Sequence, residues 1–178
     1  MELLPEIVEL QTLMDDETYN HCNNVKNAVM AVSGDLGLDQ DLLGNACAIL
    51  DIGKLLINEY VFHKAELLSR VERELMDLHS YLGYRICMEN GIPGEIAEVI
   101  LYHHGGNMPH LSNVPEMTDE IRQHAEVIHT IDAFEALTEE RGYRPGYLKD
   151  EAYAMMEESA AKERYRMDVL ELLYEMNL

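Results

Sequence analysis

Basic residues are scarce in this chain of 178 residues. Lysine and arginine together number 13, against 34 aspartates and glutamates, so the formal net charge is -21 with neutral histidine. Binding to nucleic acid or to an anionic membrane surface needs clustered Lys and Arg side chains that neutralise phosphates. The composition therefore argues against both kinds of partner, and the acidic surplus is typical of a soluble protein.

Cysteine and long apolar runs are also scarce. Cys22, Cys47 and Cys87 lie far apart and form no Cys-x-x-Cys pair, which favours reduced thiols over a disulfide framework. The first residues have no cationic segment ahead of an apolar run, and no apolar stretch approaches the roughly 20 residues of a membrane helix. We therefore expect a cytoplasmic protein that is neither secreted nor membrane-spanning.

Strand-like alternation, internal repeats and linkers are missing as well, whereas apolar residues recur at helical spacing along most of the chain. The pattern predicts helices over residues 17–36, 41–50, 69–86, 95–104, 119–140, 149–161 and 166–176. Residues 105–119 are rich in turn formers and are expected to form a loop beside any site. The length suits one domain with a full core, so the expected fold class is all-α, a single-domain helical bundle over residues 1–178.

Some histidines and carboxylates share helix faces. Glu17 and His21 are four residues apart, which puts a carboxylate and an imidazole on one face, where they could share a metal or form an exposed pair. His79 falls in the middle of a predicted helix and, taken alone, is better explained as a hydrogen-bonded histidine of the core or its edge. Neither feature by itself establishes a site.

Two further features point more strongly to chemistry. His103 and His104 end an apolar helix before a glycine pair. If they are partly buried, adjacent imidazoles cost solvation free energy unless two metals, or one metal and one substrate phosphate, organise them. Asp132 lies inside a strongly apolar helix, where a carboxylate is costly to bury. His129, three residues earlier, shares its face, so a structural hydrogen bond between the two remains an alternative to metal binding.

Taken in order, these segments resemble the HD superfamily of metal-dependent phosphohydrolases, and within it the HD-GYP branch, which cleaves cyclic dinucleotides such as cyclic di-GMP. The similar segments are His21–Val25, Leu50–Lys54, His79–Gly83, Ile100–His104, Ile131–Thr138, Arg141–Arg144 and Arg166–Leu170. The likeness runs from about Glu17 to Glu175, which is nearly the whole chain. It implies a helical bundle of the HD-domain type.

The resemblance also implies a set of metal ligands. The family's ligands for a first metal correspond to His21, Asp51 and Asp132, and those for a second metal to Asp51 as a bridge with His79, His103 and His104. Glu17 matches an additional carboxylate ligand of some trinuclear members. The nitrogen and oxygen donors suit Fe, Mn or Zn, so the resemblance implies one or two divalent ions of this kind.

Two departures from the family pattern bear on function. Leu50 stands where the family has the histidine of its His-Asp pair, and an alkyl group cannot bind a cation. After the paired histidines, residues 105–110 replace the Gly-Tyr-Pro element that helps the branch hold its cyclic dinucleotide. The first ligand set is therefore incomplete, and selectivity for cyclic di-GMP does not follow from the resemblance.

The function implied is metal-dependent hydrolysis of a phosphodiester or nucleotide. Asp51 would bridge the metals, and Lys54 would bind a phosphate oxygen or neutralise developing charge. Arg141 and Arg144 are candidate phosphate contacts or merely solvated surface. One alternative is a degenerate domain that binds a metal or nucleotide without turnover, as a sensor or docking module. Another is a structural protein whose polar core groups satisfy one another.

Overall fold

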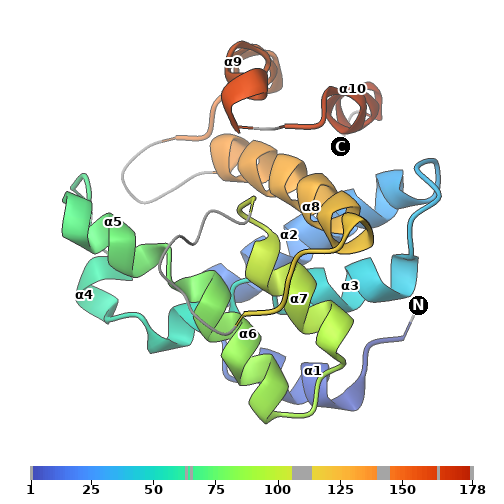
Figure 1. Ribbon diagram of the computed structural model, residues 1–178. Coiled ribbons are helices and arrows are strands. Elements are labelled where there is room, and N and C mark those ends of the chain that lie inside the picture. The colour runs from blue at the N-terminus through green and yellow to red at the C-terminus, as the bar shows by residue number, and fades with distance from the viewer. Residues whose placement is uncertain are drawn as a thin grey trace.

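The computed structural model describes residues 2–62, 64, 66–105, 114–139, 145–163 and 165–176, and these form helices with no strand among them (Figure 1). In chain order the elements are α1 (Pro5–Gln11), α2 (Asp16–Ser33), α3 (Gln40–Ala48), the 3-10 helix η1 (Ile52–Leu56), α4 (Glu59–Phe62), α5 (Arg70–Met76), α6 (His79–Glu89), α7 (Gly94–Tyr102), α8 (Asp119–Thr138), α9 (Lys149–Glu163) and α10 (Met167–Glu175). The all-α fold expected from the apolar spacing is confirmed. No helix in the described ranges has both the length and the apolar character to cross a membrane.

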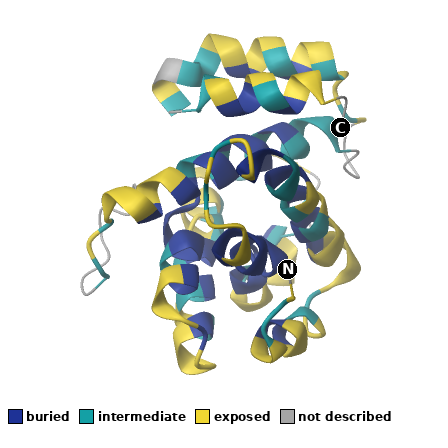
Figure 2. Ribbon diagram, turned by 90° about the vertical axis from the view of Figure 1, so that its right-hand side faces the viewer, coloured by how far each residue is buried: buried dark blue, intermediate teal, exposed yellow. Residues whose placement is uncertain are grey.

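The core lies between α2, α3, α7 and α8, in which α2 contacts α3 and α8, and α7 also contacts α3 and α8. Their inward residues include Val25, Leu43, Ile100, Ile128 and Phe134, all 2% exposed or less. Figure 2 shows the buried positions on the inner sides of the helices and the exposed ones outside. Helices α9 and α10 pack against α8, and α10 also contacts α2.

The helix predicted over residues 69–86 is interrupted. Helix α5 ends at Met76 and α6 begins at His79, so this histidine starts a helix instead of lying in the middle of one. The apolar positions that suggested continuity, Leu75 and Leu78, are 44% and 36% exposed, and α5 contains no buried residue. Periodicity predicted a helical conformation there correctly, but Asp77 and Leu78 form a turn that separates the two helices.

The close approach of η1 to α6 depends on a glycine. A Cβ atom built on Gly53 would lie 1.9 Å from the carbonyl oxygen of His79 and 2.5 Å from the backbone nitrogen of Gly83. Real Cβ atoms do not approach backbone atoms this closely. Because glycine has no Cβ, η1 can lie against the first turns of α6, and Asp51 is thereby placed beside His79.

Helix α8 has a side-chain cap at its N-terminus. The Thr118 hydroxyl oxygen accepts a hydrogen bond from the backbone N–H of Ile121 at 3.2 Å. We expect Thr118→Ala to lower the free energy of unfolding by about 1 kcal/mol, because one N–H of the first turn loses its partner. Urea denaturation measures this change. Serine at the same position keeps the acceptor and should restore most of the stability, and equal losses for both variants would contradict the assignment.

Candidate metal centre

Three histidines meet where α6 begins and α7 ends. The Nε2 atom of His79 lies 3.1 Å from Nε2 of His104 and 3.3 Å from Nε2 of His103. Helix α7 ends at Tyr102, His103 is its C-cap, and Gly105 follows with φ 81°. Because the helix ends there, the two adjacent imidazoles can point to the same place, with their ring centroids 4.0 Å apart.

Backbone contacts fix the tautomers of two of these rings. His79 Nδ1 donates to the carbonyl oxygen of Met76 at 2.7 Å, and His103 Nδ1 donates to that of Ile100 at 2.6 Å. A carbonyl oxygen can only accept, so each Nδ1 carries the hydrogen and each Nε2 presents a lone pair. Burial and the neighbouring imidazoles hold the pKa of His103 well below its usual range, which keeps the ring neutral. Neutral imidazole is the form that binds metals.

The spacing of the three nitrogens suits one cation. One ligand atom from each of His79, His103 and His104 lies within 4.8 Å of the other two. With metal–nitrogen bonds of the usual length, neighbouring ligand nitrogens are about 3.0 Å apart at right-angle positions and about 3.4 Å apart at tetrahedral positions. The observed 3.1 and 3.3 Å fall between these values. The donors therefore fit a transition metal.

A carboxylate lies next to the histidine cluster. Asp51, between α3 and η1, is 3% exposed, and its Oδ1 atom lies 3.2 Å from Nε2 of His79. Its Oδ2 atom lies 2.5 Å from Nζ of Lys54. Burial alone would raise the pKa of the Asp51 carboxyl, but the Lys54 ammonium holds that pKa well below its usual value. Asp51 is therefore an ionised oxygen donor.

On the other side of Asp51, helices α2 and α8 bring together a second group of ionisable side chains. His21 Nε2 lies 2.8 Å from Oδ1 of Asp132 and 3.8 Å from Oδ2 of Asp51, while His21 Nδ1 lies 2.9 Å from Oε2 of Glu139. Burial opposes a charge on this ring, but the Asp132 and Glu139 carboxylates outweigh it and raise the pKa of His21 to about 10. His21 is thus the centre of an ion-paired group.

Glu139 was not identified from the sequence. It follows the last residue of α8, and its second oxygen accepts a hydrogen bond from Nδ2 of Asn24 at 3.0 Å. It lies seven residues after Asp132, which places the two carboxylates two turns apart on the same side of the helix. That spacing is the signal in the sequence that could have indicated it.

The other candidate residues have different surroundings. Glu17 is exposed on α2, and within the described part of the chain no hydrogen bond or ion pair links its carboxylate to the centre, so its ligand role stays a prediction. His129 does not pair with Asp132, because its Nε2 atom donates to the carbonyl oxygen of Glu163 at 3.1 Å. Arg141 and Arg144 lie outside the described residues, as do residues 106–113 of the predicted loop.

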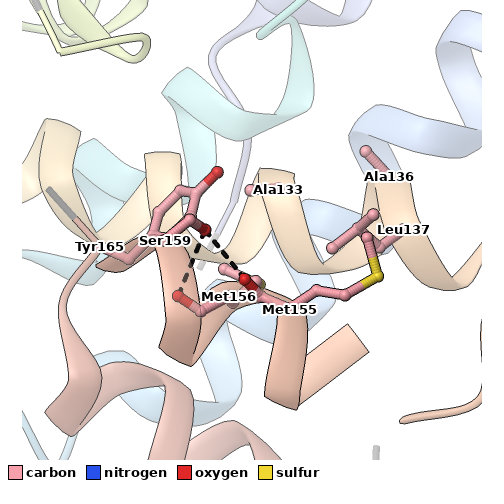
Figure 3. Close-up of a pocket in the computed structure, with 7 residues that line it drawn as sticks. All are labelled: Ala133, Ala136, Leu137, Met155, Met156, Ser159 and Tyr165. Atoms are coloured by element: carbon pink, nitrogen blue, oxygen red, sulfur yellow. Dashed lines mark hydrogen bonds between the residues drawn. The ribbon is translucent and has the colours of Figure 1, made fainter. Parts of the chain in front are cut away.

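A pocket of about 400 Å³ lies between α8 and α9, separate from these residues (Figure 3). Its lining is Ala133, Ala136, Leu137, Met155, Met156, Ser159 and Tyr165. The Ser159 hydroxyl donates to the carbonyl oxygens of Met155 and Met156 at 3.0 and 3.4 Å, so its hydrogen is already used within α9. The lining contains no ionisable group suited to metal or phosphate.

Comparison with known proteins finds one related sequence and two solved structures of similar fold. The chain is 26% identical, over 96% of its length, to a cyclic di-GMP phosphodiesterase of Thermotoga maritima, and it spans about half (48%) of that relative. Among solved structures, the HD domain of the L. monocytogenes phosphodiesterase PgpH has a TM-score of 0.67 and 17% identity, with 96% of this chain and 94% of that one covered. The same domain in complex with cyclic-di-AMP has a TM-score of 0.66 and 17% identity, with 97% and 92% covered. The HD domain family matches residues 14–169. This chain therefore belongs to the HD domain family.

Proposed function

We propose that this chain is a metal-dependent phosphohydrolase that acts on a small phosphodiester or nucleotide. The observation that carries the proposal is the convergence of three imidazole Nε2 atoms beside the buried carboxylate of Asp51. Three nitrogens and one carboxylate oxygen suit Fe, Mn or Zn better than Ca or Mg. A bound ion of this kind supplies Lewis-acid charge to a phosphoryl oxygen and lowers the pKa of water.

Each residue of the centre would have its own role in this reaction. The three histidines and Asp51 would hold the ion, and Asp51 also forms an ion pair with the ammonium of Lys54. The Lys54 side chain is 21% exposed, so it can also meet a phosphoryl oxygen and stabilise charge that develops on it. Arg141 and Arg144 are proposed as further phosphate contacts.

Substrate attraction must be local in so acidic a protein. With a net charge of -21, the surface as a whole repels a phosphate ester. Screening at physiological salt limits that repulsion to about 8 Å, so a bound divalent ion together with Lys54 dominates within the centre. The curated relative is named for cyclic di-GMP and the solved neighbour was crystallised with cyclic-di-AMP, which makes a cyclic dinucleotide one candidate substrate.

Metal removal tests the proposal. We expect treatment with a chelator to lower phosphodiester hydrolysis at least about 100-fold, because the ion contributes several kcal/mol of charge stabilisation. Adding back Mn, Fe or Zn should restore the rate. The rate is measured by chromatography, as the release of product from a panel of phosphodiesters and nucleotides that includes cyclic dinucleotides.

The same substrates are used for a control variant and show which result would contradict the proposal. His103→Gln removes one of the three nitrogens and should remain inactive after metal is added back. A fully metallated wild-type chain that releases no product from any member of the panel would contradict the proposed hydrolase.

One observation favours a second candidate, a domain that binds a nucleotide without turnover. Leu50 is fully buried in the core, at the position where the family has a metal-binding histidine. This candidate predicts saturable binding of a cyclic dinucleotide to the metal-loaded chain with no product in a single-turnover experiment. Product formation under the same conditions excludes it.

A further inference from the structure

His21 is the imidazole of the centre that lies outside the three-histidine cluster. Its Nε2 atom faces two buried carboxylates, 2.8 Å from Oδ1 of Asp132 and 3.8 Å from Oδ2 of Asp51. Ligand atoms that share one transition-metal ion are roughly 3 to 4 Å apart. The distances from His21 therefore suit side chains that share one ion, and an imidazole with carboxylates is a donor set for Fe, Mn or Zn.

This donor set has only one nitrogen. Leu50, at the position of the family's other histidine, is fully buried in the hydrophobic core and offers no donor atom. The affinity for an ion then depends strongly on the direction of the His21 ring. A ring that is free to rotate loses entropy when an ion fixes it, and this loss weakens binding. A group that fixes the ring beforehand therefore favours the ion.

Glu139 contacts the far side of this ring. Its Oε2 atom lies 2.9 Å from Nδ1 of His21, the ring nitrogen that does not face Asp132. The two nitrogens of an imidazole point in nearly opposite directions, so Glu139 is not a further ligand of an ion at Nε2. A carboxylate oxygen can only accept, so Glu139 accepts the Nδ1 hydrogen. A contact of this kind fixes both the tautomer and the orientation of a metal-binding histidine.

Asn24 fixes the carboxylate of Glu139 in turn. Its Nδ2 atom donates to Oε1 of Glu139 at 3.0 Å, so both carboxylate oxygens have a partner. Asn24 and His21 are three residues apart on α2 and lie on one face of that helix, whereas Glu139 is the C-cap of α8. The Glu139 side chain is 23% exposed, which limits competition from water. The two contacts therefore determine the direction of the His21 ring from outside the donor set.

We propose that Glu139 is a positioning residue of the metal centre, which directs Nε2 of His21 toward an ion shared with the neighbouring carboxylates. Asn24 supports this role by fixing the second oxygen of Glu139. The role rests on the proposed function, since it presupposes metal binding by the centre. In a purely structural role, the same contacts would only join the end of α8 to α2. The two roles differ in how the variants respond to metal.

Mn(II) titration of the full chain, followed by the paramagnetic resonance signal of the free ion, tests this role. His21→Ala identifies the ion concerned, because it removes the nitrogen itself. Glu139→Ala should raise the dissociation constant of that same ion about 10- to 100-fold, the usual effect of removing a partner that orients a metal-binding histidine. Glu139→Gln keeps an oxygen that can accept from Nδ1 and should recover part of the affinity. Equal affinity of the wild type and Glu139→Ala, or a His21→Ala variant that loses no ion, would overturn the proposal.

Melting temperatures separate positioning from a structural role. Each variant is melted with a chelator and again at one fixed concentration of Mn(II). An ion that binds only the folded chain raises the melting temperature, and Glu139→Ala should show a smaller rise than the wild type. Glu126→Ala is the matched control and should keep the full rise, because it removes a half-buried carboxylate of α8 that is not among those in contact with His21. A full rise in Glu139→Ala would indicate a structural role and overturn the proposal.

The proposed function can fail separately from this inference. If Glu139→Ala weakens the ion at His21 but the metal-loaded wild type hydrolyses no phosphoester, the hydrolase is excluded and the positioning role remains. If the wild type hydrolyses a phosphoester while Glu139→Ala binds Mn(II) as tightly as the wild type, the function remains and the positioning role is wrong.

Discussion

Replacing Asp51 with asparagine is expected to lower kcat/KM for phosphoester hydrolysis by about 10³-fold or more. The change keeps the shape of the side chain but removes the negative charge that lies 3.2 Å from His79 and 2.5 Å from Lys54. The ion loses an anionic ligand, and the Lys54 ammonium is left partly buried without its counter-charge. Single-turnover rates, together with metal content, measure the effect.

Asp41→Asn is the matched control for this prediction. Asp41 is an exposed carboxylate in the first turn of α3, on the same segment of chain but away from the centre. Its replacement should leave the rate within about twofold, since an exposed carboxylate contributes little to the fold. If Asp51→Asn keeps more than about a tenth of the wild-type rate, Asp51 does not have the part in hydrolysis assigned to it.

Replacing Gly53 with alanine is expected to cost about 3 kcal/mol or more of unfolding free energy. The new methyl group would lie 1.9 Å from the His79 carbonyl oxygen and 2.5 Å from the Gly83 nitrogen. Both are backbone atoms, so no side-chain rotation can make room, and η1 and α6 must separate. For a chain of this size the melting temperature should fall by roughly 6–12 °C. Thermal and urea denaturation measure both quantities.

The same substitution should impair metal binding. Moving the first turn of α6 shifts His79 relative to His103 and His104, whose Nε2 atoms now lie 3.3 and 3.1 Å away. Gly94→Ala is the control, because a Cβ at this first residue of α7 would meet no atom closer than 4.0 Å. The close approach of η1 to α6 would be refuted if both alanine variants were as stable as the wild type.

Local patterns account for most of the helices. The spacing of Val25, Val29 and Val32 on α2 predicts a buried helical face, and these side chains are fully buried. The same reasoning joined α5 to α6, because Leu75 and Leu78 continue the apolar period although both are exposed. Periodicity reports where a helix can bury a face. It does not report where a helix is interrupted by a turn, as at Asp77 and Leu78.

The contacts of the centre were harder to foresee than its residues. The expected alternative for Asp132 was a hydrogen bond to His129, its neighbour on the same helix face. In the structure Asp132 bonds His21, 111 residues away, while His129 bonds the Glu163 carbonyl oxygen. Helical neighbours are only the nearest candidates, and the packing of α2 against α8 supplies a better partner for a buried carboxylate.

The amino-acid sequence by itself determined the helical class of this protein and the supply of imidazole and carboxylate groups, because apolar spacing and side-chain chemistry are local properties. Only the tertiary structure decided which of these groups face one another. The packing of α6 on α7 brings together His79 and His103, 24 residues apart, and the packing of α2 on α8 surrounds His21 with carboxylates. Which imidazole nitrogens converge, and which carboxylates lie beside them, depends on contacts between distant segments, and no local pattern in the sequence encodes those contacts.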